Sequence, residues 1–259
     1  MEDRPSVDNL RVRVALTLTI VLCFGAAGGA QERSEHNGTS SKKVTVEGGA
    51  DMVSTFVWRG IYCAPASIQP GVTVTAGTFG FEAWGTTPFA GNGAKEVDLS
   101  LYFETGGFRV GVTDYWWPGE ESFRYFCYKK EVTDHLFEGS LSYTLPFEKF
   151  PLTISWNTLF YGSDFKENGK RNYSSYIELN YPFMVMGVDM GLSAGALPWA
   201  SPLLMPNDRN GFSICNLMIS AAKELPITDK FSLPLFTQLI FNPTLGDAFF
   251  IFGLSLRFN

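Results

Sequence analysis

Charged side chains recur at every second residue in several short segments of this 259-residue chain. In residues 95–104, Glu96, Asp98 and Glu104 alternate with apolar residues such as Leu99. A period of two places these charges on one face of an extended strand. Extending the pattern to the other segments gives one polar face, which comprises Arg59, Glu82, Glu96, Asp98, Glu104, Arg109, Glu138, Glu178, Asp189, Gln238 and Arg257.

The charged members of this face are mostly acidic, with seven carboxylates and three guanidinium groups. If the face lined an enclosed lumen, an excess of carboxylates would favour cations electrostatically. The alternative is that the charges pair across the interior and keep it hydrated and rigid. The sequence leaves both interpretations open.

Enzymatic chemistry has little support in the sequence. His36 and His135 are the only histidines, and a Ser–His hydrolase would need a serine such as Ser122 beside His135. Nothing in the spacing fixes that geometry, and no phosphate-binding glycine loop opens a helix. We therefore expect no enzyme and no cofactor.

The cysteines match no zinc-binding spacing, so we expect no metal site. Cys63 and Cys127 each fall in an expected loop of a chain that carries an export signal. Because exported chains can form disulfides, Cys63–Cys127 is a candidate disulfide, which would leave Cys215 unpaired.

The N-terminus has the organisation of an export signal. Arg11 and Arg13 precede an apolar run over residues 14–24, and small residues follow over 25–30. The run is shorter than the ~20 residues that a spanning helix needs. The expected division is a signal peptide at residues 1–30, a flexible periplasmic leader at 31–49 and a barrel at 50–259.

Alternation of apolar and polar residues predicts twelve strands. The first is expected at residues 51–59, with Arg59 on the polar face and Phe56 and Trp58 on the apolar face. The last runs over residues 248–259. The segments between them are centred on residues 67–77, 79–89, 95–104, 108–117, 136–145, 152–157, 173–181, 188–195, 212–224 and 231–241.

The connections between these segments are alternately short and long. This asymmetry, with an even strand number, is typical of outer-membrane barrels. Charged residues make up only 18% of the chain, below the ~25% of soluble domains. Aromatic residues gather at segment ends, as in interfacial belts, with Trp58, Tyr115, Trp116, Trp117 and Trp199 at the long-loop side and Phe147, Phe150, Tyr181, Phe183, Phe231 and Phe258 at the other.

We therefore predict an all-β fold: a transmembrane up-and-down antiparallel barrel of about 12 strands in a bacterial outer membrane. A soluble β-sandwich or barrel with an apolar core is the alternative. The formal charge of −6 argues against nucleic-acid partners. The expected partners are outer-membrane lipid, small polar solutes and, through the C-terminal strand, the outer-membrane assembly machinery.

The expected function is a porin-like channel for passive diffusion of small polar, cationic solutes. A second hypothesis is a non-conducting barrel that acts through external loops at residues 118–133 and 200–211, as an adhesin or a partner in a surface complex. A hydrolase at the barrel rim, built on His135, is the third.

Three short motifs carry a family resemblance: Val-Ser-Thr-Phe-Val-Trp-Arg-Gly at residues 53–60, Ala-Ser-Ile-Gln-Pro-Gly at 66–71 and Phe-Glu-Ala-Trp-Gly at 81–85. With residues 134–135 and 173–182, they resemble the uncharacterised TorF-like porins of Gram-negative bacteria. The resemblance implies an outer-membrane barrel without a known substrate, and it carries over no catalytic residue. The chain departs from the usual aromatic terminus of such barrels, because Asn259 follows Phe258.

Overall fold

The computed structural model describes residues 44–118, 123–129, 132–205, 211–228 and 231–258. The predicted signal peptide lies outside these residues. Regular structure in the described ranges is entirely β, and none of their segments forms a helix long and apolar enough to cross a membrane.

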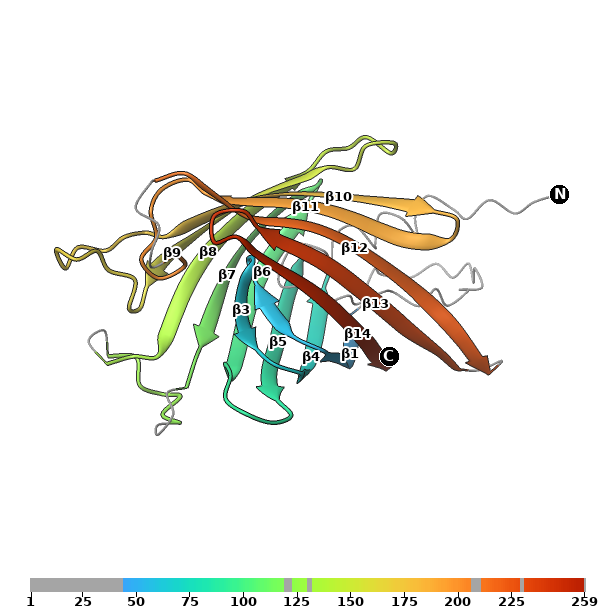
Figure 1. Cartoon of the computed structure of the whole chain (residues 1–259), viewed down its shortest axis with the longest axis horizontal. Coiled ribbons are helices and arrows are strands. Elements are labelled where there is room, and N and C mark those ends of the chain that lie inside the picture. Colours follow the sequence, from blue (N-terminus) through green and yellow to red (C-terminus); the bar gives the residue numbers. More distant parts are fainter. Residues whose placement is uncertain (1–43, 119–122, 130–131, 206–210, 229–230, 259) are drawn as a thin grey trace, which may run out of the picture.

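Fourteen strands are present in the described part of the chain (Figure 1). They are β1 (Val44–Val53), β2 (Phe56–Trp58), β3 (Ile61–Ala64), β4 (Ser67–Ala76), β5 (Phe79–Pro88), β6 (Glu96–Thr105), β7 (Phe108–Trp116), β8 (His135–Thr144), β9 (Thr153–Tyr161), β10 (Ser175–Val185), β11 (Val188–Leu197), β12 (Ser213–Thr228), β13 (Phe231–Asn242) and β14 (Asp247–Phe258).

Twelve of these strands form a closed antiparallel barrel, which confirms the predicted fold class and strand number. From β4 to β14 each strand pairs with its neighbour in sequence, and β1 closes the ring between β4 and β14. Closure leaves no strand edge, because Asp51 of β1 lies opposite both Gln69 of β4 and Ser255 of β14. β2 and β3 form a separate two-stranded sheet.

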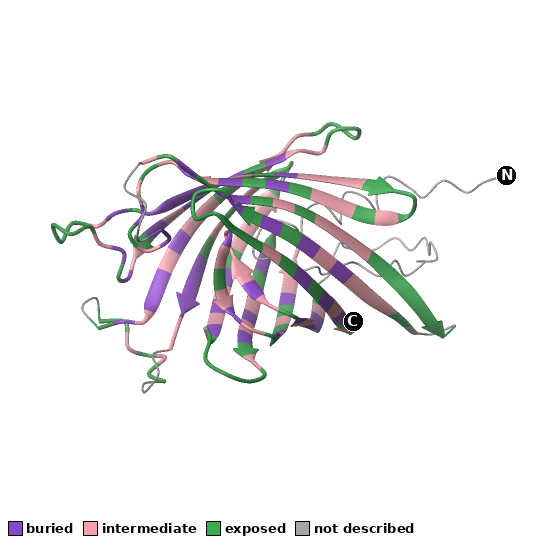
Figure 2. Cartoon of the chain, in the orientation of Figure 1, coloured by how far each residue is buried: buried purple, intermediate pink, exposed green. Residues whose placement is uncertain are grey.

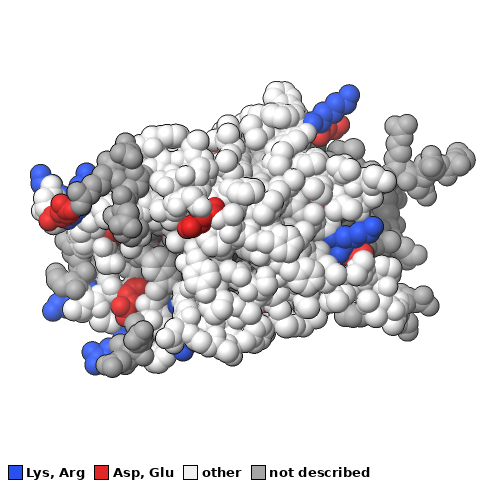
Figure 3. All heavy atoms as spheres, in the orientation of Figure 1, with Lys and Arg blue, Asp and Glu red and all other residues white. Residues whose placement is uncertain are grey.

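The predicted alternation appears as alternating burial along each strand (Figure 2). In β14, Phe250 is 66% exposed and Phe252 48%, whereas Ile251 is 3% and Ser255 1% exposed. The outer surface is therefore apolar. Charged residues on the visible face gather mainly toward its two ends, and the broad zone between them is almost free of charge (Figure 3).

The two ends of the barrel differ in their connections. The turn end holds the start of β1, the end of β14 and tight turns such as Met186–Gly187, where both φ angles are positive. The loop end holds the longer connections at residues 89–95, 117–134, 162–174 and 198–212. The predicted one-sided asymmetry is confirmed.

The first strand differs from its prediction at both ends. β1 begins at Val44, within the stretch expected as leader, and ends at Val53 rather than Arg59. There Ser54 caps the pairing with β14, since its amide donates to the Phe252 carbonyl and its hydroxyl accepts from the Phe252 amide. The chain then turns into the barrel, so the outward positions predicted for Phe56 and Trp58 are wrong.

The predicted aromatic belt at the loop end is also partly wrong. Tyr115 is 1% and Trp116 8% exposed, and Trp58 lies inside the barrel. At the turn end, Phe147, Phe150 and Phe258 are exposed as predicted.

Candidate functional site: the inner hairpin and the barrel lumen

Residues 56–64, which we call the inner hairpin, comprise β2, β3 and the two-residue turn between them. Trp58 pairs with Ile61, and the turn residues Arg59 and Gly60 have φ angles of 52° and 78°. Positive φ at both central positions defines the type I′ turn favoured in tight hairpins. The turn places Arg59 and Gly60 at the tip of the inner hairpin.

The tip of the inner hairpin lies against the wall formed by β12 and β13. The Gly60 carbonyl accepts a hydrogen bond from Asn242 of β13 at 3.0 Å. A Cβ added at Gly60 would lie 1.8 Å from the Cys215 carbonyl of β12, so only glycine fits there. The Trp58 ring packs 5.6 Å from that of Tyr115, between centroids. The inner hairpin therefore contacts several separate wall strands.

The Arg59 guanidinium is held by wall residues of three strands. Its two terminal nitrogens donate to the Glu138 carboxylate of β8 at 2.8 and 2.7 Å. Its carbon lies 4.5 Å from the ring centroid of Tyr176 in β10 and 4.4 Å from that of Trp58. The Tyr115 hydroxyl of β7 donates to the same carboxylate at 2.9 Å. Such a buried, bidentate and stacked pair is specific to arginine.

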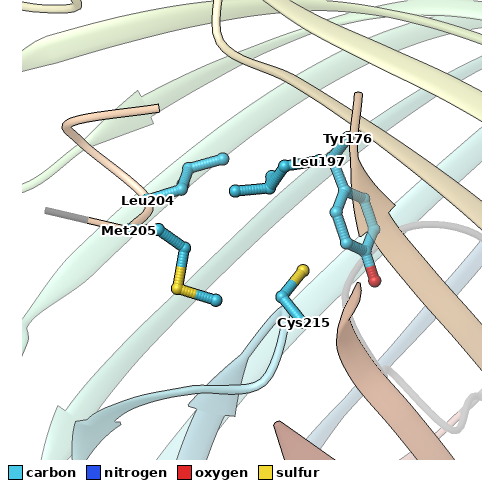
Figure 4. Packing of buried hydrophobic residues seen from close by; sticks show 5 residues of the cluster. All are labelled: Tyr176, Leu197, Leu204, Met205 and Cys215. Atoms are coloured by element: carbon cyan, nitrogen blue, oxygen red, sulfur yellow. The ribbon is translucent and has the colours of Figure 1, made fainter. Parts of the chain in front are cut away.

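Apolar clusters surround the inner hairpin and fill the loop end. One cluster brings together Tyr176, Leu197, Leu204, Met205 and Cys215 (Figure 4). Trp58 and Ile61 of the inner hairpin pack against it. Phe56 packs against Trp84 and Ala64, and Val57 packs against a third cluster on β13 and β14. At this end the lumen thus contains a small packed core.

Two loops close over this core. The Asp164 carboxylate accepts hydrogen bonds from the Ser174 amide at 2.8 Å and its hydroxyl at 2.6 Å, and Ser174 in turn bonds Ser201 at 2.6 Å. All three residues are fully buried. The network fixes the loop that carries Leu204 and Met205 above the inner hairpin.

The predicted polar face mostly lines the lumen. Glu96, Asp98, Glu138 and Gln238 are buried there. Asp189 lies on the same face but is exposed at the turn end, and Arg59 reaches the lumen from the inner hairpin rather than from a barrel strand. The remaining residues are half-buried, namely Glu82, Glu104, Arg109, Glu178 and Arg257.

Ion pairs at the turn end involve the other two arginines of this face. Arg257 contacts Asp51 at 2.7 Å across the seam between β14 and β1, and Ser255 donates to the same carboxylate at 2.6 Å. Arg109 lies 3.7 Å from Glu104. Asp51 and Arg59 are an even number of residues apart, so the same alternation places Asp51 on the polar face, although it was not among the expected lumen residues.

Three further residues of the site were missed or misplaced. Trp58 and Tyr115, which were expected in an outer belt, pack inside the barrel, and Met218 was not among the residues expected in the lumen. Gly60, which suits the second central position of a type I′ turn, was the available signal for the hairpin. Met218 faces a lumen wall that is apolar on β12–β14, where Phe236, Ile240 and Ile251 are buried.

The candidate Cys63–Cys127 disulfide is not formed, and the three cysteines in the described ranges are free. Cys63 lies in β3 within the inner hairpin. Burial, reinforced by the nearby Glu96 charge, raises the pKa of the Cys63 thiol to about 12. Because the thiolate is the reactive form, docking of the inner hairpin lowers the reactivity of Cys63.

We expect N-ethylmaleimide at pH 8 to modify Cys127 at least roughly tenfold faster than Cys63 in the folded protein. Unfolding in urea should abolish the difference, because it removes the burial that raises the Cys63 pKa. Mass spectrometry of quenched samples measures both rates. Equal rates in the folded protein would contradict the docked position of β3.

His135 is fully buried and has both ring nitrogens engaged. Nδ1 lies 2.7 Å from the Asp114 carboxylate, and Nε2 lies 2.5 Å from the Tyr125 carbonyl. These two contacts hold the imidazole in place inside the protein. Ser122 lies outside the described residues. The geometry indicates that His135 anchors the loop that carries Tyr125.

No family model matches this sequence, and neither does any curated protein. No match therefore supports the TorF-like family specifically. Among solved structures, the chain is similar to the COG4313 outer membrane channel from Pseudomonas putida F1. The TM-score is 0.42 at 11% identity, over 86% of this chain and 100% of that chain. This similarity is too low to carry an argument about function.

Proposed function

We propose that this protein is a bacterial outer-membrane channel for small polar solutes, with a preference for cations. The observation that carries the proposal is an inside-out barrel, apolar outside and polar along most of its lumen. A closed barrel satisfies its backbone hydrogen bonds internally, which a lipid environment requires. The exposed Phe250 and Leu101 would then contact lipid.

The polar wall supports the cation preference. Glu82, Glu96 and Asp98 lie on neighbouring strands β5 and β6, and Glu138 lies on β8. The seven carboxylates of the polar face outnumber its three arginines, so the lumen keeps a net negative formal charge. Such a charge raises the local concentration of cations.

Conduction requires the inner hairpin to move. Its tip accepts a hydrogen bond from Asn242 of β13, and its side chains complete the apolar clusters of the loop end. We infer a closed state with the inner hairpin docked and an open state with it withdrawn. The C-terminal strand β14, with exposed aromatics ending at Phe258, would serve the assembly machinery as insertion signal.

Planar-bilayer recording under a tenfold KCl gradient tests the channel. We expect single-channel openings whose reversal potential lies toward that of K⁺. Glu96→Gln combined with Asp98→Asn should reduce the permeability ratio of K⁺ to Cl⁻ by roughly twofold or more, because two lumen charges are lost. The Asp189→Asn variant, altered at an exposed position, is the control and should change the ratio less.

Absence of openings from the correctly folded protein, or a reversal potential toward that of Cl⁻, would contradict this function. The second candidate would then be favoured, namely a non-conducting barrel that acts through its loops. The observation supporting it is the packed loop end, where the Asp164–Ser174–Ser201 network holds a rigid surface. A stable co-purifying surface partner, lost when the 162–174 loop is shortened, would identify it.

A further inference from the structure

Arg59 occupies a recess that is built by the barrel wall and not by the hairpin alone. Glu138 supplies two acceptors, Tyr176 supplies an aromatic face, and Tyr115 orients the carboxylate. These three residues belong to β8, β10 and β7. They would therefore remain in place if the inner hairpin withdrew. Of the residues that contact Arg59, only Trp58 belongs to the inner hairpin and would leave with it.

The chemistry of the recess selects a planar guanidinium group. A carboxylate that accepts two parallel N–H donors matches the guanidinium fork, whereas an ammonium group can satisfy only part of it. The Tyr176 face adds a cation–π contact, which is strengthened by exclusion of water. Tyr176 is 3% exposed, so that contact lies in a largely dry environment.

The hairpin backbone supports the same conclusion. Arg59 has a φ of 52°, a conformation in which Asn, Asp or Gly is favoured at this turn position. A non-glycine residue in this region is strained. The guanidinium contacts offset this strain, so a competitor that fills the recess removes a stabilising contact of the docked tip.

We propose that Glu138, Tyr176 and Tyr115 form a guanidinium-binding site in the lumen, which Arg59 occupies as a tethered ligand. A solute with a terminal guanidinium group competes with Arg59 and favours the withdrawn hairpin. The transport consequence rests on the proposed channel, but binding to the recess does not. The tether gives Arg59 a high effective concentration, so free ligand binds the wild-type chain weakly.

Calorimetric titration of the full barrel in detergent with methylguanidinium tests the site. We expect Arg59→Ala to bind methylguanidinium at least about tenfold tighter than the wild type, because the internal competitor is gone. Methylammonium should bind this variant at least roughly tenfold more weakly than methylguanidinium. Adding Glu138→Gln to Arg59→Ala should abolish the gain.

The matched control is Glu104→Gln in the Arg59→Ala background. It removes another lumen carboxylate, one that lies beside Arg109 at the turn end. Binding should persist. If Glu104→Gln and Glu138→Gln weaken binding equally, the ligand responds to general lumen charge and the proposal fails.

Arg59→Lys covers the case in which Arg59→Ala does not fold, since it keeps the positive charge. Its ammonium cannot fill the fork, so methylguanidinium should still bind several-fold tighter than to the wild type. No gain in either folded variant would overturn the site. Because binding is measured without current, a conducting protein that fails to bind refutes the site alone, and a binding protein that fails to conduct refutes the channel alone.

Discussion

Removing the inner hairpin should raise the single-channel conductance by about an order of magnitude, because its side chains fill the loop end of the lumen. Val53 of β1 lies directly opposite Ser67 of β4, so a two- to four-residue Gly/Asn turn can replace residues 55–65 and keep Ser54, which caps the pairing with β14. Planar-bilayer recording of the shortened and full chains measures the effect. The expected result is a larger and continuously open current.

The control for this deletion is a shortened 89–95 loop, which lies at the same end and contacts the inner hairpin through the Ala94 amide. It should leave the conductance within about twofold of the wild type. Unchanged conductance after deletion of the inner hairpin would place the constriction elsewhere.

Glu138→Leu should have the largest effect of any single substitution on docking of the inner hairpin. Removing one partner of a buried ion pair costs about 3–5 kcal/mol, because the other charge stays buried without compensation. The Arg59 charge can regain solvation only if the inner hairpin withdraws and exposes it to water. The rate of Cys63 alkylation in the folded protein should therefore rise about a hundredfold or more, since each 1.4 kcal/mol changes an equilibrium about tenfold.

Two further variants separate this effect from loss of lumen charge. Glu104→Leu removes a half-exposed partner of Arg109 and should leave the Cys63 rate within about threefold of the wild type. Arg59→Met combined with Glu138→Leu replaces both charges with apolar groups and should restore most of the protection. A double variant as reactive as Glu138→Leu alone would show that the ion pair does not hold the inner hairpin.

The sequence predicted the barrel well because burial in β strands follows a local rule. β6 and β14 alternate strictly between lumen and exterior, so each residue reports its own face. The short connections, such as Met186–Gly187, could be located for the same reason. The structure adds the closing register between β1 and β14, which places Asp51 opposite Ser255 and within reach of Arg257.

The candidate site was only partly predictable, because its decisive contacts join residues far apart in the chain. Arg59 was expected in the lumen, but pairing with Glu138 spans 79 residues and no local pattern encodes it. Phe56 and Trp58 alternate as lipid-facing residues would, although they pack inside the barrel. Alternation of apolar and polar residues shows that one face of a strand is apolar. It does not show whether that face contacts lipid or packs inside the barrel, as the inner hairpin does.

The central claim is that withdrawal of the inner hairpin opens the lumen, and Cys63 permits the most direct measurement. A Cys127→Ser chain, in which Cys215 is 1% exposed, is recorded in a bilayer while a trimethylammonium methanethiosulfonate reagent is added. The account predicts that modification of Cys63 prevents redocking, so the current rises and stays high until a reductant removes the group, and that Cys63→Ser abolishes this response. Complete modification of Cys63, verified by mass spectrometry, with an unchanged current would contradict the account.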